Sequence, residues 1–113
     1  AEECWYKSLT PLMAEVREKL GDGPVYLSFD IDGIDPAFAP GTGTAEIGGL
    51  TSTQGIEIIR GMRGLDVVGG DLVEVSPPYD PFGNTSVLAA NLLFEMLCIL
   101  PGVRYDDKVK AIY

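Results

Sequence analysis

The sequence has 113 residues, 46% of them apolar, and it carries 17 acidic against 8 basic side chains, for a formal charge of −9 at neutral pH. A chain of this length can bury one core, and nothing in it predicts a second domain or an internal repeat. No apolar run is long enough for a membrane helix and the excess of acids argues against nucleic-acid binding, so we expect a soluble, intracellular protein with a cationic ligand.

The first half of the chain predicts a helix, a strand and a long loop. Thr10-Pro11 is a typical helix start, with the Thr10 hydroxyl as the expected cap, and Gly21 ends the helix. The segment from Pro24 to Asp30 is rich in β-branched and aromatic residues and predicts a strand. Residues 36–50 contain two prolines and four glycines. We therefore expect a long loop there, and long loops are often functional.

The second half predicts a helix, a strand and another helix. Residues 51–54 match a capping box, and apolar residues at helical spacing continue to Gly64. The segment from Leu65 to Val75 is apolar enough for a strand buried on both faces. A long helix follows up to Leu100, and its apolar side chains nearly encircle it, which predicts thorough burial. The tail at residues 103–113 is charged and aperiodic, so we assign it no structure.

The order of these elements predicts the fold class. Two strands joined through a helix usually lie parallel in one sheet. We therefore expect a layered α/β fold. The sequence contains no histidine, so a metal site built from this chain alone would use oxygen or thiolate ligands. Cys4 lies in a polar opening and Cys98 in an apolar run, and this pattern indicates two free thiols.

Acidic residues stand where both predicted strands end: Asp30 and Asp32 at the end of the first strand, and Glu74 at the end of the second. Parallel strands of an α/β sheet bring their carboxyl ends to one edge, where such sheets bind ligands. Residues i and i+2 of an extended strand point to the same side, so Asp30 and Asp32 can direct both carboxylates at one point. Close carboxylates repel unless a cation lies between them. The pattern predicts a divalent cation site, with Glu74 also available to a bound cation.

Simpler interpretations of these acids remain open. Asp30 and Asp32 can cap a turn into the glycine-rich loop, and Glu74 can be a solvated acid at a strand end. Asp35 precedes Pro36 and is more typical of a turn than of a site. The four residues from Asp30 to Gly33 also resemble the haloacid-dehalogenase-like phosphatases, in which Asp30 would be a nucleophile toward phosphate. The later lysine and acidic pair that such a phosphatase needs have no counterpart at a strand end.

A much longer stretch, residues 23–101, resembles the ureohydrolases, the family of arginases, agmatinases and guanidinobutyrases. Its signature segments are Ser28-Phe29-Asp30-Ile31-Asp32-Gly33-Ile34-Asp35-Pro36, Ala39-Pro40-Gly41-Thr42-Gly43-Thr44 and Gly48-Gly49-Leu50-Thr51. The later segment Asp71-Leu72-Val73-Glu74-Val75-Ser76-Pro77-Pro78-Tyr79-Asp80 is similar to the agmatinase and guanidinobutyrase branch. Arginases tend to have Asn-Pro after the Glu-Val pair.

The resemblance implies a three-layer α/β/α fold with a mostly parallel sheet, of which this chain would be the C-terminal part. It implies two manganese ions, or nickel in some relatives, with Asp30 bridging the metals, Asp32 binding one of them and Glu74 holding the substrate guanidinium. A metal-bridging hydroxide would attack the guanidinium carbon and release urea and an amine. Agmatine, which belongs to polyamine metabolism, and guanidinobutyrate both remain open as substrates. The family also implies a homo-oligomer, cytoplasmic or, in a eukaryote, mitochondrial.

The chain departs from the family pattern in two places. Ala45 stands where the family usually has proline, which affects only the stiffness of the loop. The histidine ligands and the Asp-Ala-His-x-Asp ligand segment of the family would lie upstream, and nothing in this sequence replaces them. Two hypotheses follow: the chain is part of a complete agmatinase-like enzyme, or it is a short, non-catalytic subunit that acts in assembly.

Overall fold

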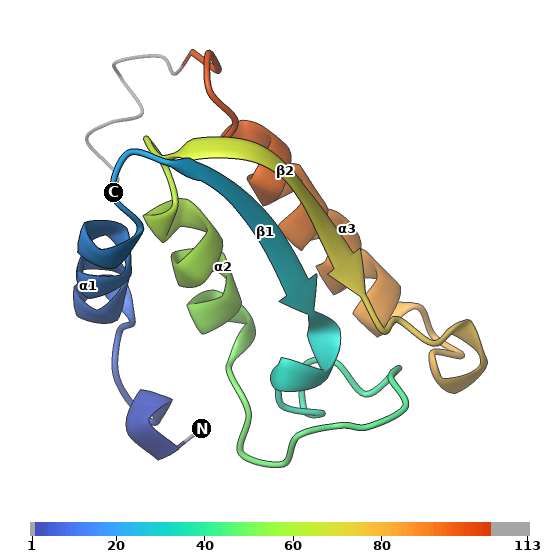
Figure 1. The fold of residues 1–113 in the computed structure, drawn as a ribbon. Helices are drawn as coiled ribbons and strands as arrows, with labels where there is room; N and C mark the ends of the chain where they lie inside the picture. Colours follow the sequence, from blue (N-terminus) through green and yellow to red (C-terminus); the bar gives the residue numbers. More distant parts are fainter. Residues whose placement is uncertain (1, 105–113) are drawn as a thin grey trace.

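The computed structural model describes residues 2–104, and Figure 1 shows their arrangement. Two strands lie side by side, and three α-helices pack behind them. In chain order the elements are the 3-10 helix η1 (Glu2–Cys4), α1 (Thr10–Leu20), β1 (Pro24–Asp30), the 3-10 helix η2 (Ile31–Gly33), α2 (Ser52–Gly61), β2 (Asp66–Val73), the 3-10 helix η3 (Pro77–Tyr79) and α3 (Asn84–Cys98). Val103 and Arg104 have no regular structure. The remainder of the tail, for which we predicted none, lies outside the described residues.

The two strands are parallel and form one sheet, as predicted. Their register runs from Pro24 opposite Asp66 to Asp30 opposite Val73, with one irregularity after Val25. The connection from β1 to β2 passes through the long loop and α2. Because the strands are parallel and end as a register pair, their carboxyl ends lie at the same edge of the sheet.

The sheet has one covered face within residues 2–104. Val25, Phe29 and Val67 are buried in the core against the helices. On the other face, Tyr26 of β1 is 62% exposed and Val68 of β2 is 63% exposed. The predicted α/β class is confirmed, but the expectation that β2 is buried on both faces is wrong, because no described element covers the second face.

Two glycines that weaken the helical pattern of α2 allow it to pack closely. A Cβ atom at Gly61 would lie 2.6 Å from Cγ of Met13 on α1. A Cβ atom at Gly55 would lie 3.1 Å from Cδ1 of Ile34 and 3.4 Å from Cζ of Phe29. The absence of side chains at these positions therefore brings α2 against α1 on one side and against the core on the other.

The starts of the first two long helices use different caps. The capping box at α2 is confirmed: Gln54 N–H donates to Thr51 Oγ1 at 3.1 Å, and Thr51 N–H donates to Gln54 Oε1 at 3.0 Å. The expected Thr10 cap of α1 is wrong, because Thr10 is already helical and Leu9 holds the cap position. Instead Leu9 N–H donates to Glu57 Oε2 at 2.8 Å, which ties the start of α1 to α2.

Helix α3 is less buried than its composition predicts. Its buried stripe consists of Thr85, Ala89, Leu92, Glu95 and Met96. Apolar side chains outside this stripe are exposed, with Val87 at 72%, Phe94 at 62% and Leu97 at 61%. The expectation of burial all round is wrong because residues 2–104 supply no element on that side of α3.

Two further observations concern the chain as a whole. Cys4 and Cys98 are free thiols, as predicted. None of the helices built from the described residues has the length and apolar run that crossing a bilayer requires.

Candidate functional site

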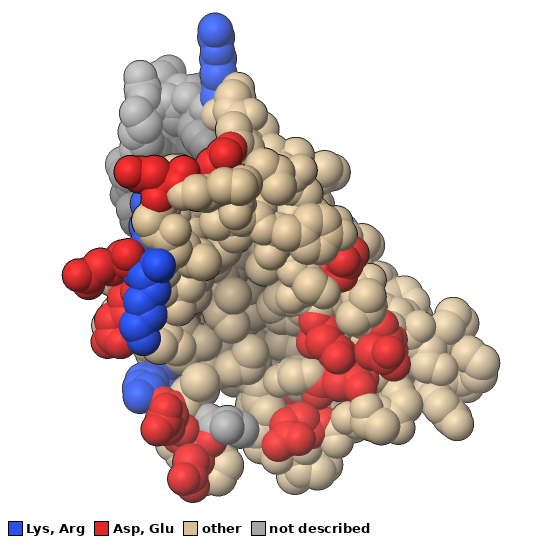
Figure 2. All heavy atoms as spheres, viewed as in Figure 1, with Lys and Arg blue, Asp and Glu red and all other residues tan. Residues whose placement is uncertain are grey.

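The acidic residues identified in the sequence gather at the carboxyl edge of the sheet. Asp30 is the last residue of β1 and is the register partner of Val73, the last residue of β2. Glu74 therefore comes directly after the position that faces Asp30. Figure 2 shows acidic side chains clustered around this edge, whereas the Lys and Arg side chains visible in the same view lie on the α1 side and at the opposite end. The edge thus offers a negative surface suited to cations.

Asp30 and Asp32 are joined by a turn rather than by extended backbone. Asp30 Oδ1 accepts a hydrogen bond from Asp32 N–H at 2.9 Å, and residues from Ile31 to Gly33 form η2. Ile31 is fully buried and anchors this turn in the core. The expectation that the two carboxylates project from one strand is wrong, because the chain leaves the strand conformation immediately after Asp30. The simpler alternative, in which Asp30 caps a turn, is confirmed for its Oδ1 atom.

Asp32 is held at several points but keeps one unsatisfied oxygen. Its Oδ2 accepts a hydrogen bond from Thr44 Oγ1, and its carbonyl oxygen accepts one from Glu46 N–H at 3.2 Å. Its Oδ1 atom is buried and has no hydrogen-bond partner among the described residues. Leaving a buried carboxylate oxygen without a partner is costly. A cation at this oxygen would remove that cost.

Glu74 has an unusual backbone conformation. Its φ is +71°, in the left-handed region, and it is one of two such non-glycine residues in residues 2–104. Its side chain is exposed and makes no hydrogen bond within this part of the chain. Left-handed φ values in a non-glycine residue cost roughly 1–3 kcal/mol and tend to persist at functional positions.

The predicted residues do not by themselves complete a metal centre. Across residues 2–104 no three Asp, Glu or Cys side chains converge as a metal-binding group. The turn joins Asp30 and Asp32, while Glu74 lies after the last residue of the neighbouring strand. The edge therefore presents part of a site.

A cluster around Asp80 anchors the glycine-rich loop next to this edge. Asp80 accepts hydrogen bonds from Thr85 N–H at 3.1 Å and from Ser86 N–H at 2.9 Å and Oγ–H at 2.6 Å. These bonds, above all the one from the Ser86 hydroxyl, hold the pKa of Asp80 below its ordinary value. Gly41 N–H donates to Thr85 Oγ1 at 2.8 Å, and Ser76 N–H donates to Gly41 O at 2.9 Å. The loop is thus fixed to the start of α3.

Sequence reasoning missed this cluster. The sequence marked Asp80 only as the last residue of a segment similar to the agmatinase and guanidinobutyrase branch, and Gly83, rather than Asp80, holds the cap position of α3. Gly41 is required for the contact, because a Cβ atom there would lie 2.5 Å from Cβ of Asp80 and 2.9 Å from Thr85 Oγ1.

Asp35 has a structural role, as predicted. Its Oδ1 accepts from Ala37 N–H at 2.8 Å in a turn, and its Oδ2 accepts from Gly48 N–H at 2.8 Å. Both carboxylate oxygens are therefore used inside the loop, and Asp35 fixes the conformation of Gly48, whose φ is +75°.

A second polar group lies on the uncovered face of the sheet. Asp71 accepts hydrogen bonds from Ser28 Oγ at 2.7 Å and Tyr26 Oη at 2.8 Å. These bonds, led by the one from Ser28, lower the pKa of Asp71, and the same contact raises the pKa of Tyr26. The sequence showed no sign of this group because it depends on the pairing of Ser28 with Asp71 across the strands.

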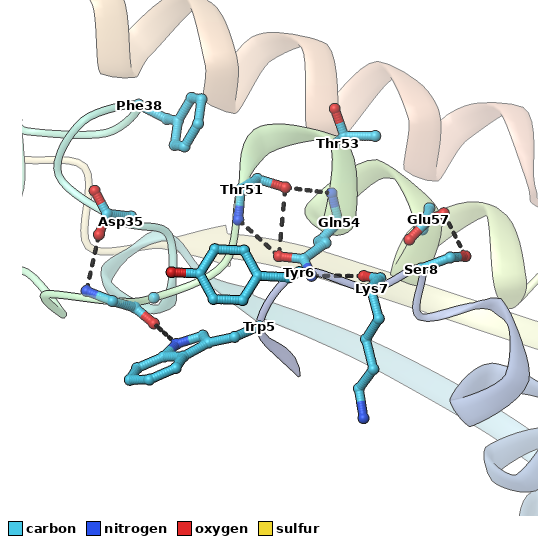
Figure 3. A pocket seen from close by; sticks show the side chains of 12 residues that line it. Trp5, Tyr6, Lys7, Ser8, Asp35, Phe38, Thr51, Thr53, Gln54 and Glu57 are labelled. Atoms are coloured by element: carbon cyan, nitrogen blue, oxygen red, sulfur yellow. Dashed lines mark hydrogen bonds between the residues drawn. The ribbon is translucent and has the colours of Figure 1, made fainter. Parts of the chain in front are cut away.

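A cavity near the N-terminal segment lies apart from the three acids. Its volume is about 630 Å³, and Trp5, Tyr6 and Phe38 contribute its aromatic side chains. None of the three candidate site residues lines it. In Figure 3 the hydroxyl groups of Tyr6 and Thr53 and the amine of Lys7 have no hydrogen bond drawn, whereas the other polar groups of the cavity bind one another or the backbone. Glu57, for example, accepts from Ser8 Oγ at 2.7 Å and from Leu9 N–H at 2.8 Å. The hollow is therefore not part of the candidate site at the carboxyl edge of the sheet.

Comparisons with known proteins relate the chain to one family. A sequence profile described as the arginase family matches residues 1–98. The chain is 80% identical over 103 residues to a guanidinobutyrase from Pseudomonas aeruginosa, covering 91% of this chain and 32% of that protein. It is 72% identical over 104 residues to a mitochondrial agmatinase from Gallus gallus, covering 92% of this chain and 31% of that protein.

Among solved structures, the chain is similar to the proclavaminate amidino hydrolase of Streptomyces clavuligerus. The TM-score is 0.76 at 48% identity, over 80% of this chain and 30% of that one. The chain thus spans about a third of the length of the curated relatives it matches. The match over residues 1–98 also supersedes the four-residue resemblance to phosphatases.

Proposed function

The chain belongs to the arginase family, and on that premise we propose that it forms one side of a ureohydrolase active site. The reaction is the hydrolysis of a guanidino compound to urea and an amine. The single observation that carries this proposal is the edge of the sheet: Asp30 ends β1, Asp32 lies in the turn after it, Glu74 follows the paired β2, and one buried oxygen of Asp32 has no hydrogen-bond partner within residues 2–104.

Asp30 and Asp32 are the proposed metal ligands. Two divalent cations fit this donor set, because hard cations prefer carboxylate oxygens and Asp32 Oδ1 is buried without a hydrogen bond in the described part of the chain. Manganese is the first choice and nickel the second. When bound, such a pair lowers the pKa of water enough to supply a nucleophile near neutral pH. Asp30 is proposed to bridge the two ions and Asp32 to bind one.

Glu74 is the proposed partner of the substrate guanidinium. A carboxylate can bind the planar guanidinium through two parallel hydrogen bonds, which orients its central carbon as well as holding it. The left-handed backbone of Glu74 supports this role, because strain of this kind persists where a side chain must occupy one position. In this proposal Glu74 binds and orients, while the metal ligands determine where the nucleophile lies.

The substrate is proposed to be a small cationic guanidino compound of the guanidinobutyrate or agmatine type. The relative at 80% identity is a guanidinobutyrase and the one at 72% is an agmatinase, so the similarity favours neither strongly. The acidic carboxyl edge suits the guanidinium of both. A homo-oligomer is part of the same proposal.

One observation favours an alternative in which the chain is a non-catalytic subunit. The sequence has no histidine, and residues 2–104 contain no converging group of three potential ligands. A chain with only these ligands would have to complete its site with groups from another polypeptide. In that case it would act in assembly rather than in turnover by itself.

The test uses the protein expressed from its complete reading frame, incubated with Mn²⁺ and either guanidinobutyrate or agmatine, with urea release as the measurement. The proposal expects urea release that depends on the added metal and is lost in Asp30→Asn, Asp32→Asn and Glu74→Gln. The matched control is Asp22→Asn, an exposed acid outside the site.

Three outcomes separate the hypotheses. Metal-dependent urea release that Asp22→Asn keeps and the site variants lose supports the enzyme. Urea release only after addition of the Pseudomonas aeruginosa guanidinobutyrase, above the rate of that enzyme alone, supports the non-catalytic subunit. No urea release under either condition, from protein that binds Mn²⁺ normally, refutes the proposed reaction.

A further inference from the structure

We propose that Thr44 is a positioning residue for Asp32: its hydroxyl fixes one carboxylate oxygen of Asp32 so that the other is left for a metal ion. This inference deepens the proposed function and rests on Asp32 being a ligand. It assigns a specific task to the glycine-rich loop, which the sequence predicted only as a long loop, a kind of segment that is often functional or disordered.

The carboxylate of Asp32 has two unequal oxygens. Oδ2 accepts from Thr44 Oγ1, whereas Oδ1 is buried without a partner within residues 2–104. A free carboxylate can rotate about its last bond and exchange its two oxygens. A hydroxyl bound to Oδ2 opposes this rotation, so Oδ1 remains the oxygen available to a cation.

The backbone of Asp32 is fixed as well. Its N–H donates to Asp30 Oδ1 at 2.9 Å, and its carbonyl oxygen accepts from Glu46 N–H at 3.2 Å. Thr44 and Glu46 therefore contact Asp32 from the same loop, twelve and fourteen positions further along the chain. Because hydrogen bonds hold both the N–H and the carbonyl oxygen of Asp32, its side chain is the part that can still rotate. The Thr44 contact restricts that rotation.

Thr44 can position the Asp32 carboxylate only if Thr44 is itself held in place. Gly41, three residues earlier, donates to Thr85 Oγ1 at 2.8 Å and accepts from Ser76 N–H at 2.9 Å. After Thr44, Gly49 N–H donates to Glu46 O at 3.0 Å, and Leu50 N–H donates to Gly33 O at 2.8 Å. The loop is thus attached to the start of α3 on one side and to the turn after β1 on the other.

This arrangement resembles the way outer groups orient metal ligands in proteins generally. Hydrogen bonds to a ligand fix its direction, and their removal typically weakens metal binding about 10- to 100-fold. Thr44 is itself exposed, so losing its hydroxyl should affect the ligand far more than the stability of the fold. The expected signature is weakened metal binding in a protein that remains folded.

The experiment compares Thr44→Val and Thr44→Ser in the protein expressed from its complete reading frame. Thr53→Val is the matched control, because Thr53 is also exposed but lies on α2, away from Asp32. The first measurement is the apparent dissociation constant for Mn²⁺, from competition with a chelating dye. The second is the thermal midpoint without added metal, and the third is urea release at limiting and at saturating Mn²⁺.

We expect Thr44→Val to weaken Mn²⁺ binding about 10- to 100-fold with an unchanged metal-free thermal midpoint. Urea release should fall at limiting Mn²⁺ and recover toward wild type at saturating Mn²⁺. Thr44→Ser, which retains the hydroxyl, should stay close to wild type, and so should Thr53→Val.

Wild-type Mn²⁺ affinity in Thr44→Val would overturn the inference and leave the proposed function intact. Equal losses in Thr44→Ser and Thr44→Val would also overturn it, because the hydroxyl would then not be the cause. If the wild-type protein binds no divalent cation, the inference and the proposed metal site fail together.

Discussion

Replacing Glu74 separates the role of its carboxylate from the strain of its backbone. Glu74→Gly and Glu74→Ala both remove the carboxylate, so both should abolish urea release if Glu74 binds the guanidinium. They differ in the Cβ atom, which is what makes a φ of +71° unfavourable. The glycine variant should therefore be the more stable of two equally inactive proteins.

The size of the difference follows from two opposing terms. Relieving the left-handed strain contributes roughly 1–2 kcal/mol to the glycine variant. Glycine also gains freedom in the unfolded chain, which costs roughly 0.5–1 kcal/mol relative to alanine. With the middle of each range, the net advantage is about 0.75 kcal/mol, equivalent to a shift of roughly 0.25–0.75 M in the urea concentration at the unfolding midpoint.

The measurement is urea-induced unfolding followed by circular dichroism for wild type and both variants, alongside urea release under saturating metal. Glu74→Asn provides an intermediate, because asparagine tolerates the left-handed region better than alanine does. If Glu74→Ala is as stable as Glu74→Gly, the Cβ atom at this left-handed φ does not strain the backbone. If Glu74→Gly retains turnover, the carboxylate is not the guanidinium partner.

Three further predictions concern the framework of the site. Gly41→Ala should destabilise the protein by about 1–3 kcal/mol, because its Cβ atom would lie 2.5 Å from Cβ of Asp80. A Cβ atom at Gly43 would meet nothing within 4 Å, so Gly43→Ala should leave the urea concentration at the unfolding midpoint nearly unchanged. Glu95→Gln should lower the free energy of unfolding by about 1–2 kcal/mol, because it weakens the two hydrogen bonds to Arg60 of 2.6 and 2.8 Å. The Arg60 side chain is 31% exposed, so solvent partly screens this ion pair. A double-mutant cycle with Arg60→Met that gives no coupling energy would contradict this prediction. Asp80 has a lowered pKa in the folded protein, so its carboxylate stabilises the fold above its ordinary pKa of roughly 3.9 and this contribution is lost as pH falls through the folded value. The difference in thermal midpoint between wild type and Asp80→Asn should accordingly be largest at neutral pH and shrink below about pH 4.

The order of elements could be predicted because glycine and proline mark their limits. Pro24 to Asp30 was predicted as a strand and is β1, and the capping box at Thr51 begins α2 as expected. The parallel pairing followed from the strand–helix–strand order. What failed was burial: the exposed face of the sheet and the exposed side of α3 carry apolar residues such as Val68 and Phe94. A pattern of apolar residues predicts that a surface should be covered, but not that the covering group lies within the same segment.

The sequence singled out candidate residues for the site but not their contacts. Asp30, Asp32 and Glu74 were singled out because each stands where a predicted strand ends, and their roles stay predictions. The contacts around them could not be predicted, because they join distant parts of the chain: Thr44 of the loop binds Asp32, and the loop itself is attached at Gly41 to Thr85 at the start of α3. The left-handed φ of Glu74 could not be predicted either, because glutamate rarely adopts that conformation and is not a residue type that indicates it.

The structural and the metal-binding interpretations of Asp30 and Asp32 are compatible, although the sequence presents them as alternatives. The turn uses only Oδ1 of Asp30, through the Asp32 N–H, and the loop uses only Oδ2 of Asp32, through Thr44. Each carboxylate therefore commits one oxygen to holding the local structure and keeps the other free of hydrogen bonds within residues 2–104. A turn that merely needed capping would not require the remaining oxygen of Asp32 to be buried without a partner. The burial of that single atom is the feature that a structural role leaves unexplained and a bound cation explains.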